Sequence, residues 1–518
     1  MIQLKVGIVL ALLVAAQPLS AAWLEARTDH FIVYSEGNEA STIAFAAKLE
    51  RFDQGMRKLR GLSDGELERA NPLSVYVVSN ISNVQKLCGG VVARPSAKTN
   101  CKTIAGFYTG RVSGALAFTP RSAGGDPDDA LVILFHEYGH HIMLVNSAAA
   151  YPAWFTEGFA EFNSTAKPDK KGKVGFGLIA RHRAYGLLLG KDIPIEKLLV
   201  GTTSDFKGGA ELDVFYGRSW LLTHYLAFEP TRAGQLEKYL IAVNRGERGL
   251  DAARAAFGDL ATLDRDLDRY MIKPMRYIEL PVADVPNTAI KLRALSPGEN
   301  ALMPVRLQSD RGVDEEGAAA LVIEARRLAA PFATDPGAQL ALAEAELDAG
   351  NFAASEAAAD RALVAAPDNY KALLFKGKAL MALAQQNKTS EEGSWRRIRS
   401  FFMKANRLNN NGAEALWLFY RSFREQGLPP TPNAIAALER ASALAPQDKQ
   451  VRFALANEYL RSDRLAEARS VLVVMAYDPH AAPDNFPARI IKAIDSKDPS
   501  VLKALMSDKG APRDGEEN

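Results

Sequence analysis

Hydrophobic residues follow two different periods in the first half of the chain. Short runs of β-branched and aromatic residues at 30–35 and 73–79 are typical of β-strands, and two shorter runs predict further strands at 103–108 and 115–119. Between the first two runs, apolar residues from Phe45 to Leu59 recur at spacings of three and four, which predicts one buried face of a helix. This mixture of strands and helices predicts an α+β domain.

The second half of the chain repeats a helical pattern. It is rich in alanine and leucine, and its helix-ending turns recur at intervals of roughly 31 to 43 residues. One unit carries Ala343, Gly350, Phe352, Ala362 and Pro367. These residues resemble the small, turn-forming, bulky and helix-stopping positions of tetratricopeptide repeats, and the resemblance implies stacked helical hairpins over residues 315–495. A helical domain of plain αα-hairpins is the alternative.

Changes in composition give the domain boundaries. Residues 23–275 form the mixed α+β part, and an all-α repeat domain follows it. Between them, residues 276–314 hold several prolines with little periodicity, which is typical of a linker or a small β extension. The end of the chain, 496–518, is interpreted as a polar tail.

The N-terminus has the features of a secretory signal peptide, residues 1–22. Lys5 precedes an apolar run, 6–16, and small residues follow up to Ala22, where cleavage is expected. The run is about half of the ~20 residues that a membrane-spanning helix needs, and an uncleaved anchor is the alternative. No later segment is long and apolar enough to span a bilayer. We therefore expect an exported chain, periplasmic or secreted, without stable membrane insertion after cleavage.

Composition narrows the classes of function. Lys plus Arg number 63 and Asp plus Glu number 61, a balance that argues against a dedicated nucleic-acid-binding protein. Two cysteines are too few for a four-cysteine zinc site. In an oxidising compartment Cys88 and Cys101 can close a loop as a disulfide, and two free thiols are the alternative.

The distinctive feature of the sequence is the motif His136-Glu137-Tyr138-Gly139-His140. It lies in a helix that is predicted to open at Asp126-Pro127, an N-cap followed by proline. Two histidines four residues apart lie one turn apart on the same helix face, so both rings can bind one ion, and zinc suits them. Glu137 lies on the neighbouring strip, in position for a general base. His141 points about 100° away around the helix and is expected to be a packing residue.

A third ligand is expected on a second helix that begins near Pro152. Sixteen residues separate His140 from Glu157, enough for a loop and a returning helix. The run 154–158, WFTEG, together with the histidine motif, resembles the gluzincin metallopeptidases, a group that includes thermolysin. The resemblance implies a zincin-like fold, one Zn²⁺ ion held by His136, His140 and Glu157, and Glu137 as the base.

Two further roles follow from this resemblance. Glu161, one turn after the expected ligand glutamate, would orient a ligand histidine, with a solvent-facing charge as the alternative. Similar peptidases take the donor for the oxyanion from a later helix, for which Tyr216 is the first candidate and His224 the second; either could instead be an ordinary packing residue. The predicted strand at 115–119 precedes the metal helix, as the substrate-binding edge strand does in similar enzymes.

The main prediction for function is an exported zinc metallopeptidase, an endopeptidase that hydrolyses peptide or protein substrates. Its repeats would bind a partner or a substrate protein on their concave surface. One alternative is a catalytically inactive peptidase-like scaffold that acts through its repeats, although an intact Glu137 counts against it. The other is a zinc hydrolase of a non-peptide bond, such as a cell-wall linkage.

Overall fold

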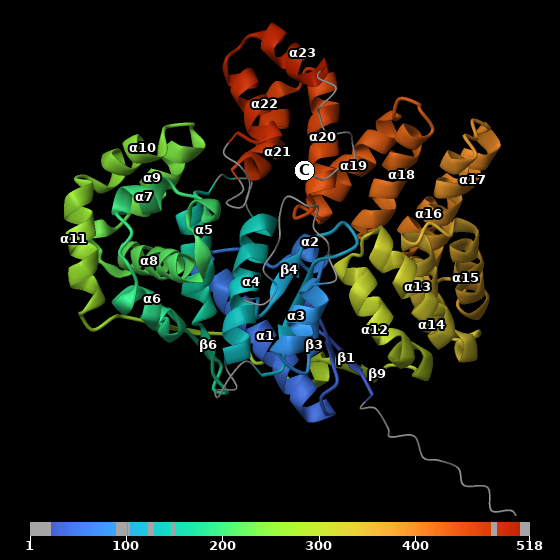
Figure 1. Ribbon diagram of the computed structural model, residues 1–518, viewed down its shortest axis with the longest axis horizontal. Helices are drawn as coiled ribbons and strands as arrows, with labels where there is room; N and C mark the ends of the chain where they lie inside the picture. The colour runs from blue at the N-terminus through green and yellow to red at the C-terminus, as the bar shows by residue number, and fades with distance from the viewer. Residues whose placement is uncertain are drawn as a thin grey trace, which may run out of the picture.

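The computed structural model describes residues 22–89, 101, 104–122, 129–146, 149, 151–477 and 484–507. Residues 1–21 of the predicted signal peptide, the predicted helix start at 126–127 and the polar residues 508–518 lie outside this range. Three groups of elements follow one another along the chain (Figure 1). A mixed sheet with its covering helices is in the middle, a helical group lies on one side of it, and a row of helical hairpins lies on the other.

The main sheet has six strands in the order β4-β5-β3-β2-β1-β9. Their bounds are β1 (Leu24–Arg27), β2 (Phe31–Ser35), β3 (Leu73–Val78), β4 (Phe107–Thr109), β5 (Leu116–Pro120) and β9 (Lys291–Ala294). The three central strands β2, β3 and β5 are parallel, whereas β1 and β4 run antiparallel to their neighbours. A smaller antiparallel sheet joins β6 (Lys167–Pro168), β7 (Lys173–Phe176) and β8 (Ile278–Pro281).

Helices cover both faces of the main sheet. Among the described residues, the helices of the first half are α1 (Glu39–Arg60), α2 (Glu66–Arg69), α3 (Ile81–Gly89), α4 (Asp129–Asn146), α5 (Ala153–Ser164), α6 (Ala184–Leu189), α7 (Ile195–Val200), α8 (Gly208–Phe228), α9 (Gln235–Asn244), α10 (Gly249–Phe257) and α11 (Leu260–Met271). Of these, α1, α3 and α4 contact strands of the main sheet. Short 3₁₀ turns are η2 (Arg181–Arg183), η3 (Thr203–Asp205), η4 (Pro230–Arg232), η5 (Asn287–Ala289) and η6 (Ala330–Phe332). Phe31 and Val33 of β2 pack with α1 and α4, while Ile32 and Tyr34 face the opposite side, because successive strand residues alternate.

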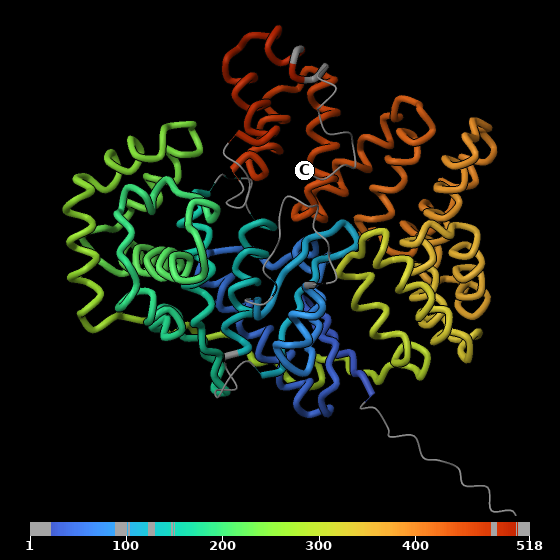
Figure 2. The backbone as a smooth tube through the Cα atoms, in the orientation of Figure 1, coloured from blue at the N-terminus to red at the C-terminus, as the bar shows by residue number. Residues whose placement is uncertain are grey.

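The second half consists of consecutive helices that pack as hairpins. They are α12 (Pro297–Arg311), α13 (Glu315–Ala329), α14 (Pro336–Asp348), α15 (Phe352–Ala365), α16 (Tyr370–Gln386), α17 (Glu392–Leu408), α18 (Ala413–Glu425), α19 (Pro432–Leu444), α20 (Lys449–Arg461), α21 (Leu465–Ala476), α22 (Phe486–Asp495) and α23 (Pro499–Ser507). The small residues Ala343 and Ala362 are fully buried, and Ala343 lies in the apolar cluster that neighbouring helices share. The row curves from the sheet edge round towards α4 (Figure 2). Helix α23 occupies part of the segment that was expected to be a tail.

The segment 276–314 is not a free linker. Its strand β9 pairs with β1, with Leu292 opposite Ala26, and so closes one edge of the main sheet. Its helix α12 is capped by Ser296 and packs Met303 and Leu307 onto the sheet. Proline at the first helical position and Pro304 inside the helix mask its periodicity in the sequence. The segment therefore belongs to both halves of the molecule.

The structure also differs from the expectation for the edge strand. The strand expected at 115–119 forms as β5, but it lies inside the sheet between β3 and β4. The short strand β4 pairs back along β5, with Tyr108 opposite Ala117, and becomes the edge next to α4. The sulfur atoms of Cys88 and Cys101 are bonded to each other.

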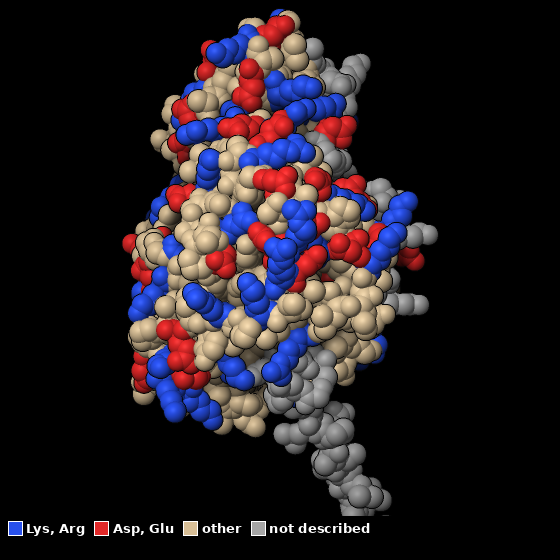
Figure 3. All heavy atoms as spheres, turned by 90° about the vertical axis from the view of Figure 1, so that its left-hand side faces the viewer, with Lys and Arg blue, Asp and Glu red and all other residues tan. Residues whose placement is uncertain are grey.

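Two further features of the molecule are the hydropathy of its helices and the distribution of charge on its surface. Among the described residues, no helix combines the length and apolar character that crossing a membrane requires. On the face that includes α10 and α11, basic and acidic side chains are interspersed (Figure 3).

A buried network of ionisable groups ties α1 to β2 and α4. His30 Nδ1 lies 3.0 Å from Glu50 Oε2, and Arg57 Nε lies 2.8 Å from Asp53 Oδ2. Asp53 also accepts a hydrogen bond of 2.5 Å from the hydroxyl of Tyr138, inside the histidine motif. Burial lowers the pKa of His30, but the hydrogen bond with Glu50 and the charges of Asp53 and Glu50 raise it above 6.5. The back of α4 is therefore anchored by charges and not by apolar packing alone.

We expect His30 to make stability depend on pH. Since its folded-state pKa is raised, its contribution is fully present below the unfolded value of about 6.5 and is lost as pH rises through the folded value. Urea unfolding should show that the stability difference between wild type and His30→Gln is constant below about pH 6.5 and shrinks above it. A difference that stays constant or grows over that range would contradict the assignment.

Candidate metal centre

His136, His140 and Glu157 meet at one point between α4 and α5. The Nε2 atoms of the two histidines are 3.1 Å apart, and Glu157 Oε2 lies 3.5 Å from the first and 3.4 Å from the second. Glu157 is enclosed, with 1% of its surface exposed, whereas both histidines are partly open. The three residues that the sequence assigned to one ion are thus side by side.

Their separations suit a tetrahedral zinc ion. With zinc–ligand distances of about 2.0–2.2 Å, neighbouring ligand atoms of a tetrahedral site lie roughly 3.3–3.6 Å apart. The observed separations of 3.1, 3.4 and 3.5 Å are close to these edges. Two imidazoles and one carboxylate are also the donor set of catalytic zinc sites, which keep a fourth position open. The residues present therefore fit one zinc ion.

Two glycines let the helices come close enough for this meeting. A Cβ at Gly139 would lie 3.0 Å from the Cα of Ala160, where α4 crosses α5. A Cβ at Gly158 would lie 2.3 Å from the carbonyl oxygen of Ser219, where α5 crosses α8. Larger residues at these positions would push the helices apart. Glu157 is on α5, the helix that lies between α4 and α8. The position of the third ligand thus depends on backbone-to-backbone packing.

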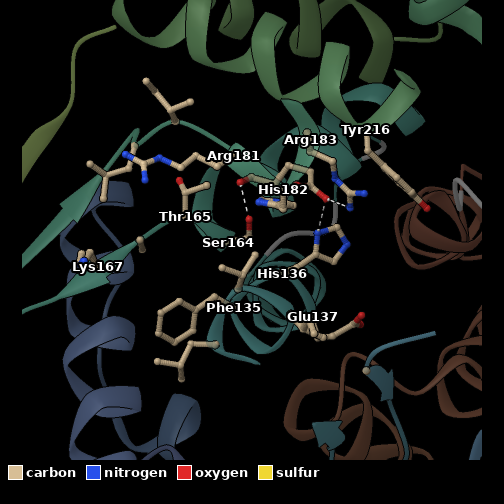
Figure 4. Close-up of a pocket in the computed structure, with 18 of the residues that line it drawn as sticks. Phe135, His136, Glu137, Ser164, Thr165, Lys167, Arg181, His182, Arg183 and Tyr216 are labelled. Atoms are coloured by element: carbon tan, nitrogen blue, oxygen red, sulfur yellow. Dashed lines mark hydrogen bonds and ion pairs between the residues drawn. The ribbon is translucent and has the colours of Figure 1, made fainter. Parts of the chain in front are cut away.

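Glu161 holds the ring of His136. Its Oε1 lies 3.1 Å from His136 Nδ1, so Nδ1–H donates to it and leaves Nε2 available to a metal. The same carboxylate accepts from His182 Nε2 at 2.7 Å and from Arg183 Nη2 at 2.5 Å. Figure 4 shows His136, His182 and Arg183 converging. With 0% exposure, Glu161 has the contacts of an orienting carboxylate and not of a solvent-facing charge.

The site stabilises a positive charge between these carboxylates. Burial raises the pKa values of Glu157 and Glu161, but the neighbouring histidines, and for Glu161 also Arg183, lower both below 4.5. For His136, burial lowers the pKa, but hydrogen bonds and charges from the two glutamates raise it to about 10. Arg183 already supplies one positive charge to Glu161, and a divalent ion beside Glu157 can supply further compensating charge to the buried pair of carboxylates.

Glu137 stands at the junction of two cavities. One of about 1170 Å³ extends past His136 towards Arg181 and Lys167, and the other of about 690 Å³ extends past His140 towards the helical repeats. Glu137 lines both of them. In Figure 4 its side chain points away from Phe135, towards the ribbon of the C-terminal helices. The side chain of Glu137 is therefore accessible from both cavities.

Of the two oxyanion candidates, only Tyr216 lies at this site. Its ring is 6.2 Å from that of His136, and the guanidinium of Arg183 stacks 4.8 Å from its centre. Burial and the charge of Glu157 raise the pKa of Tyr216 above 10, which keeps its hydroxyl protonated.

His224 is not brought to the metal site, although it is on the same helix. Its Nδ1 lies 2.9 Å from the hydroxyl of Tyr270, and its Nε2 lies 3.0 Å from the carbonyl oxygen of Gly177. Burial lowers its pKa, so it is a neutral ring with both nitrogens engaged. His141 is likewise buried, and its Nδ1 accepts a hydrogen bond of 3.0 Å from Tyr108 of β4. Burial lowers the pKa of His141 to about 3.

Sequence reasoning missed His182 and Arg183. Both lie in the short turn η2, and Arg183 Nη1 is also 3.0 Å from Asp213 Oδ1 on α8. Nothing in the run 181–183, RHR, distinguishes a histidine that contacts a carboxylate from one on a solvated turn. The sequence offered one indirect indication of such residues: a buried glutamate that orients a ligand, as expected for Glu161, would itself need hydrogen-bond donors.

Comparisons with known proteins find likenesses only in structure. No protein-family model matches the sequence, and no curated protein matches it. Solved structures that resemble the chain include a thermophilic tetratricopeptide-repeat protein of Thermus thermophilus, with 21% identity and a TM-score of 0.31, which covers 40% of this chain and 99% of its own. Another is the MamA RS-1 ArsTM double mutant, with 17% identity and a TM-score of 0.27, which covers 36% of this chain and 98% of its own.

These comparisons assign no peptidase family to the chain. The similar structures include a repeat protein, and the chain itself is mostly helical, with a mixed sheet near its N-terminus. Stacked hairpins follow from the packing of α12–α22 described above, and the case for a metal comes from the geometry of the site.

We expect Glu161→Gln to weaken zinc binding by about 10- to 100-fold, since it removes the charge that orients His136. Competition with a chromophoric chelator measures the affinity, and circular dichroism checks the fold. Glu211→Gln, an exposed change at the start of α8, is the matched control and should leave affinity unchanged. Equal affinities for both variants would contradict the role of Glu161.

Proposed function

We propose that this protein is a zinc-dependent metallopeptidase that hydrolyses peptide bonds, with a zincin-like first half as in the gluzincins. The observation that supports it most is the meeting of His136, His140 and Glu157 at tetrahedral spacing, with Glu137 beside them. Export to the periplasm or outside the cell remains part of this proposal, on the basis of the predicted signal peptide.

The chemistry follows from the residues around the ion. Zinc held by these three residues would polarise a carbonyl and lower the pKa of water. Glu137 accepts a proton from the attacking water and returns it to the leaving amine. The hydroxyl of Tyr216, protonated at neutral pH, donates a hydrogen bond to the developing oxyanion.

Strand β4 offers a place for the substrate backbone. It is the outermost strand of the sheet on the side of α4, and an extended peptide can add to such an edge. The hydrogen bond from Tyr108 to His141 fixes β4 against the metal helix. A peptide paired with β4 would therefore lie next to Glu137 and His140.

The first test compares wild type with Glu137→Gln. We expect wild type to cleave an unfolded protein mixture, and the variant to lose activity by on the order of 10²–10⁴ while it keeps its zinc. Mass spectrometry of the fragments and metal analysis of both chains measure this. Well-folded wild type that binds no zinc would overturn the proposal.

A second test addresses the oxyanion donor. We expect Tyr216→Phe to lower kcat by about 10²–10³, with little change in KM or zinc content, because the lost hydrogen bond forms only in the transition state. Tyr185→Phe, an exposed change on α6, is the control and should behave as wild type. An unchanged kcat for Tyr216→Phe would remove this residue from the mechanism.

A second candidate function is a scaffold that acts through its repeats. The stacked helical hairpins favour it, since such rows are generally protein-interaction modules. If wild type and Glu137→Gln both bind zinc and neither cleaves any protein, this candidate replaces the peptidase. Cleavage of a cell-wall fragment but of no peptide would instead indicate a hydrolase of a non-peptide bond.

A further inference from the structure

The helical repeats form one wall of a cavity that opens at the metal site. The cavity of about 690 Å³ is lined on one side by Glu137, His140 and Thr156. Its opposite side consists of residues 446–450 and 452 around the start of α20, with Met475 in the last turn of α21 and Tyr477 just after that helix. A substrate that enters this cavity would therefore touch the repeats as well as the metal site.

This wall is attached to the first half by direct contacts. Gln447 Nε2 donates to the carbonyl oxygen of Arg111 at 3.1 Å, next to β4. A Cβ at Gly110 would lie 2.8 Å from the side chain of Gln447, so the two segments touch closely. Arg452 Nη2 donates to the carbonyl oxygen of Leu144, in the last turn of the metal helix, at 3.4 Å. The repeats are thus held at a fixed place beside the cavity.

Arg452 is the unusual group on this wall. Only 7% of its surface is exposed, and its Nε donates to the carbonyl oxygen of Pro446. The equally buried Arg57 and Arg218 have carboxylate partners, but within the described residues the hydrogen bonds of Arg452 go to backbone carbonyls alone. Burial lowers its pKa to about 10, so it remains charged at neutral pH. A buried cation of this kind has capacity for an anion.

The structural contacts of Arg452 do not involve its whole guanidinium group. The contact through Nη2 connects the repeats to the end of α4, where a cation is favourable, whereas the contact through Nε stays within the repeats, at Pro446. Neither contact involves Nη1, and the side chain lines the cavity. The first residues of α20, including Lys449, lie on the same wall, and the carboxylate of Asp448 caps this helix by accepting from the N–H of Val451.

We propose that Arg452, with the start of α20, is a carboxylate-binding subsite of the substrate cleft. This rests on the proposed function, and it places a determinant of specificity in the repeats instead of the metal-binding half. The carboxylate is that of an acidic side chain or of the substrate's C-terminus, and both present the same planar pair of oxygens to a guanidinium.

The test measures binding without hydrolysis. In the zinc-loaded Glu137→Gln chain, fluorescence anisotropy gives Kd for three labelled alanine–serine peptides. The first is neutral, with an amidated C-terminus and no acidic residue, the second is amidated and contains a single aspartate, and the third has no acidic residue but a free C-terminal carboxylate. We expect at least one carboxylate peptide to bind on the order of 10-fold more tightly than the neutral one. Which of the two does so identifies the source of the carboxylate.

When Arg452→Met is added to the Glu137→Gln chain, it should abolish that preference. Arg452→Lys keeps the positive charge and should retain part of the preference; it serves as the test if Arg452→Met does not fold. Arg399→Met is the matched control: Arg399 is 9% exposed on α17, and its side-chain hydrogen bonds go to Ser422 and Gln426. It should leave the preference unchanged.

Three results would overturn the subsite: no preference in the parent chain, a preference that survives Arg452→Met, or its equal loss in Arg399→Met. Failure of the proposed function is distinguishable, because it shows as absence of cleavage by wild type. A carboxylate preference without cleavage by wild type would support the subsite and contradict the peptidase proposal. Cleavage without a carboxylate preference would support the peptidase proposal and contradict the subsite.

Discussion

The close crossing of three helices is the constraint on which the proposed metal site depends. At Gly139 and Gly158 the backbones of α4, α5 and α8 approach so nearly that a single added methyl group would meet the next helix. This packing sets the distance from Glu157 to the two histidines on α4. A metal-ligating residue on a flexible loop would have to become ordered when the metal binds. Helices packed at this density hold their side chains in place before the metal binds.

Buried charge gives the same site its chemical character. Glu157 and Glu161 are both enclosed, and the donors that reach Glu161 come from His136, His182 and Arg183. Arg183 also stacks on Tyr216, so one guanidinium links the carboxylate that orients a ligand to the residue proposed to stabilise the oxyanion. Behind the helix, the His30 network fixes α4 from the other side. Charges in contact with both sides of α4 limit how far it can shift.

The two halves of the chain share structure instead of being joined by a tether. Strand β9 completes the sheet of the first half, and α12 covers one face of that sheet while it begins the row of hairpins. Further along the row, at the start of α20, Gln447 and Arg452 contact the segment next to β4 and the last turn of α4. The repeats therefore contact the first half at two separate places, and the cavity beside the candidate metal site is built from both halves.

The sequence by itself determined what local periodicity can encode. The spacing of four in His136 and His140 fixes their common face on any helix, and the same spacing relates Glu157 to Glu161. Tertiary structure decided which distant residues meet them. Tyr216 and His224 are equally plausible along α8, yet they lie about 12 Å apart along its axis, and of the two only Tyr216 lies near His136. His182 and Arg452 carry no local pattern, because their roles arise from contacts between segments far apart in the chain.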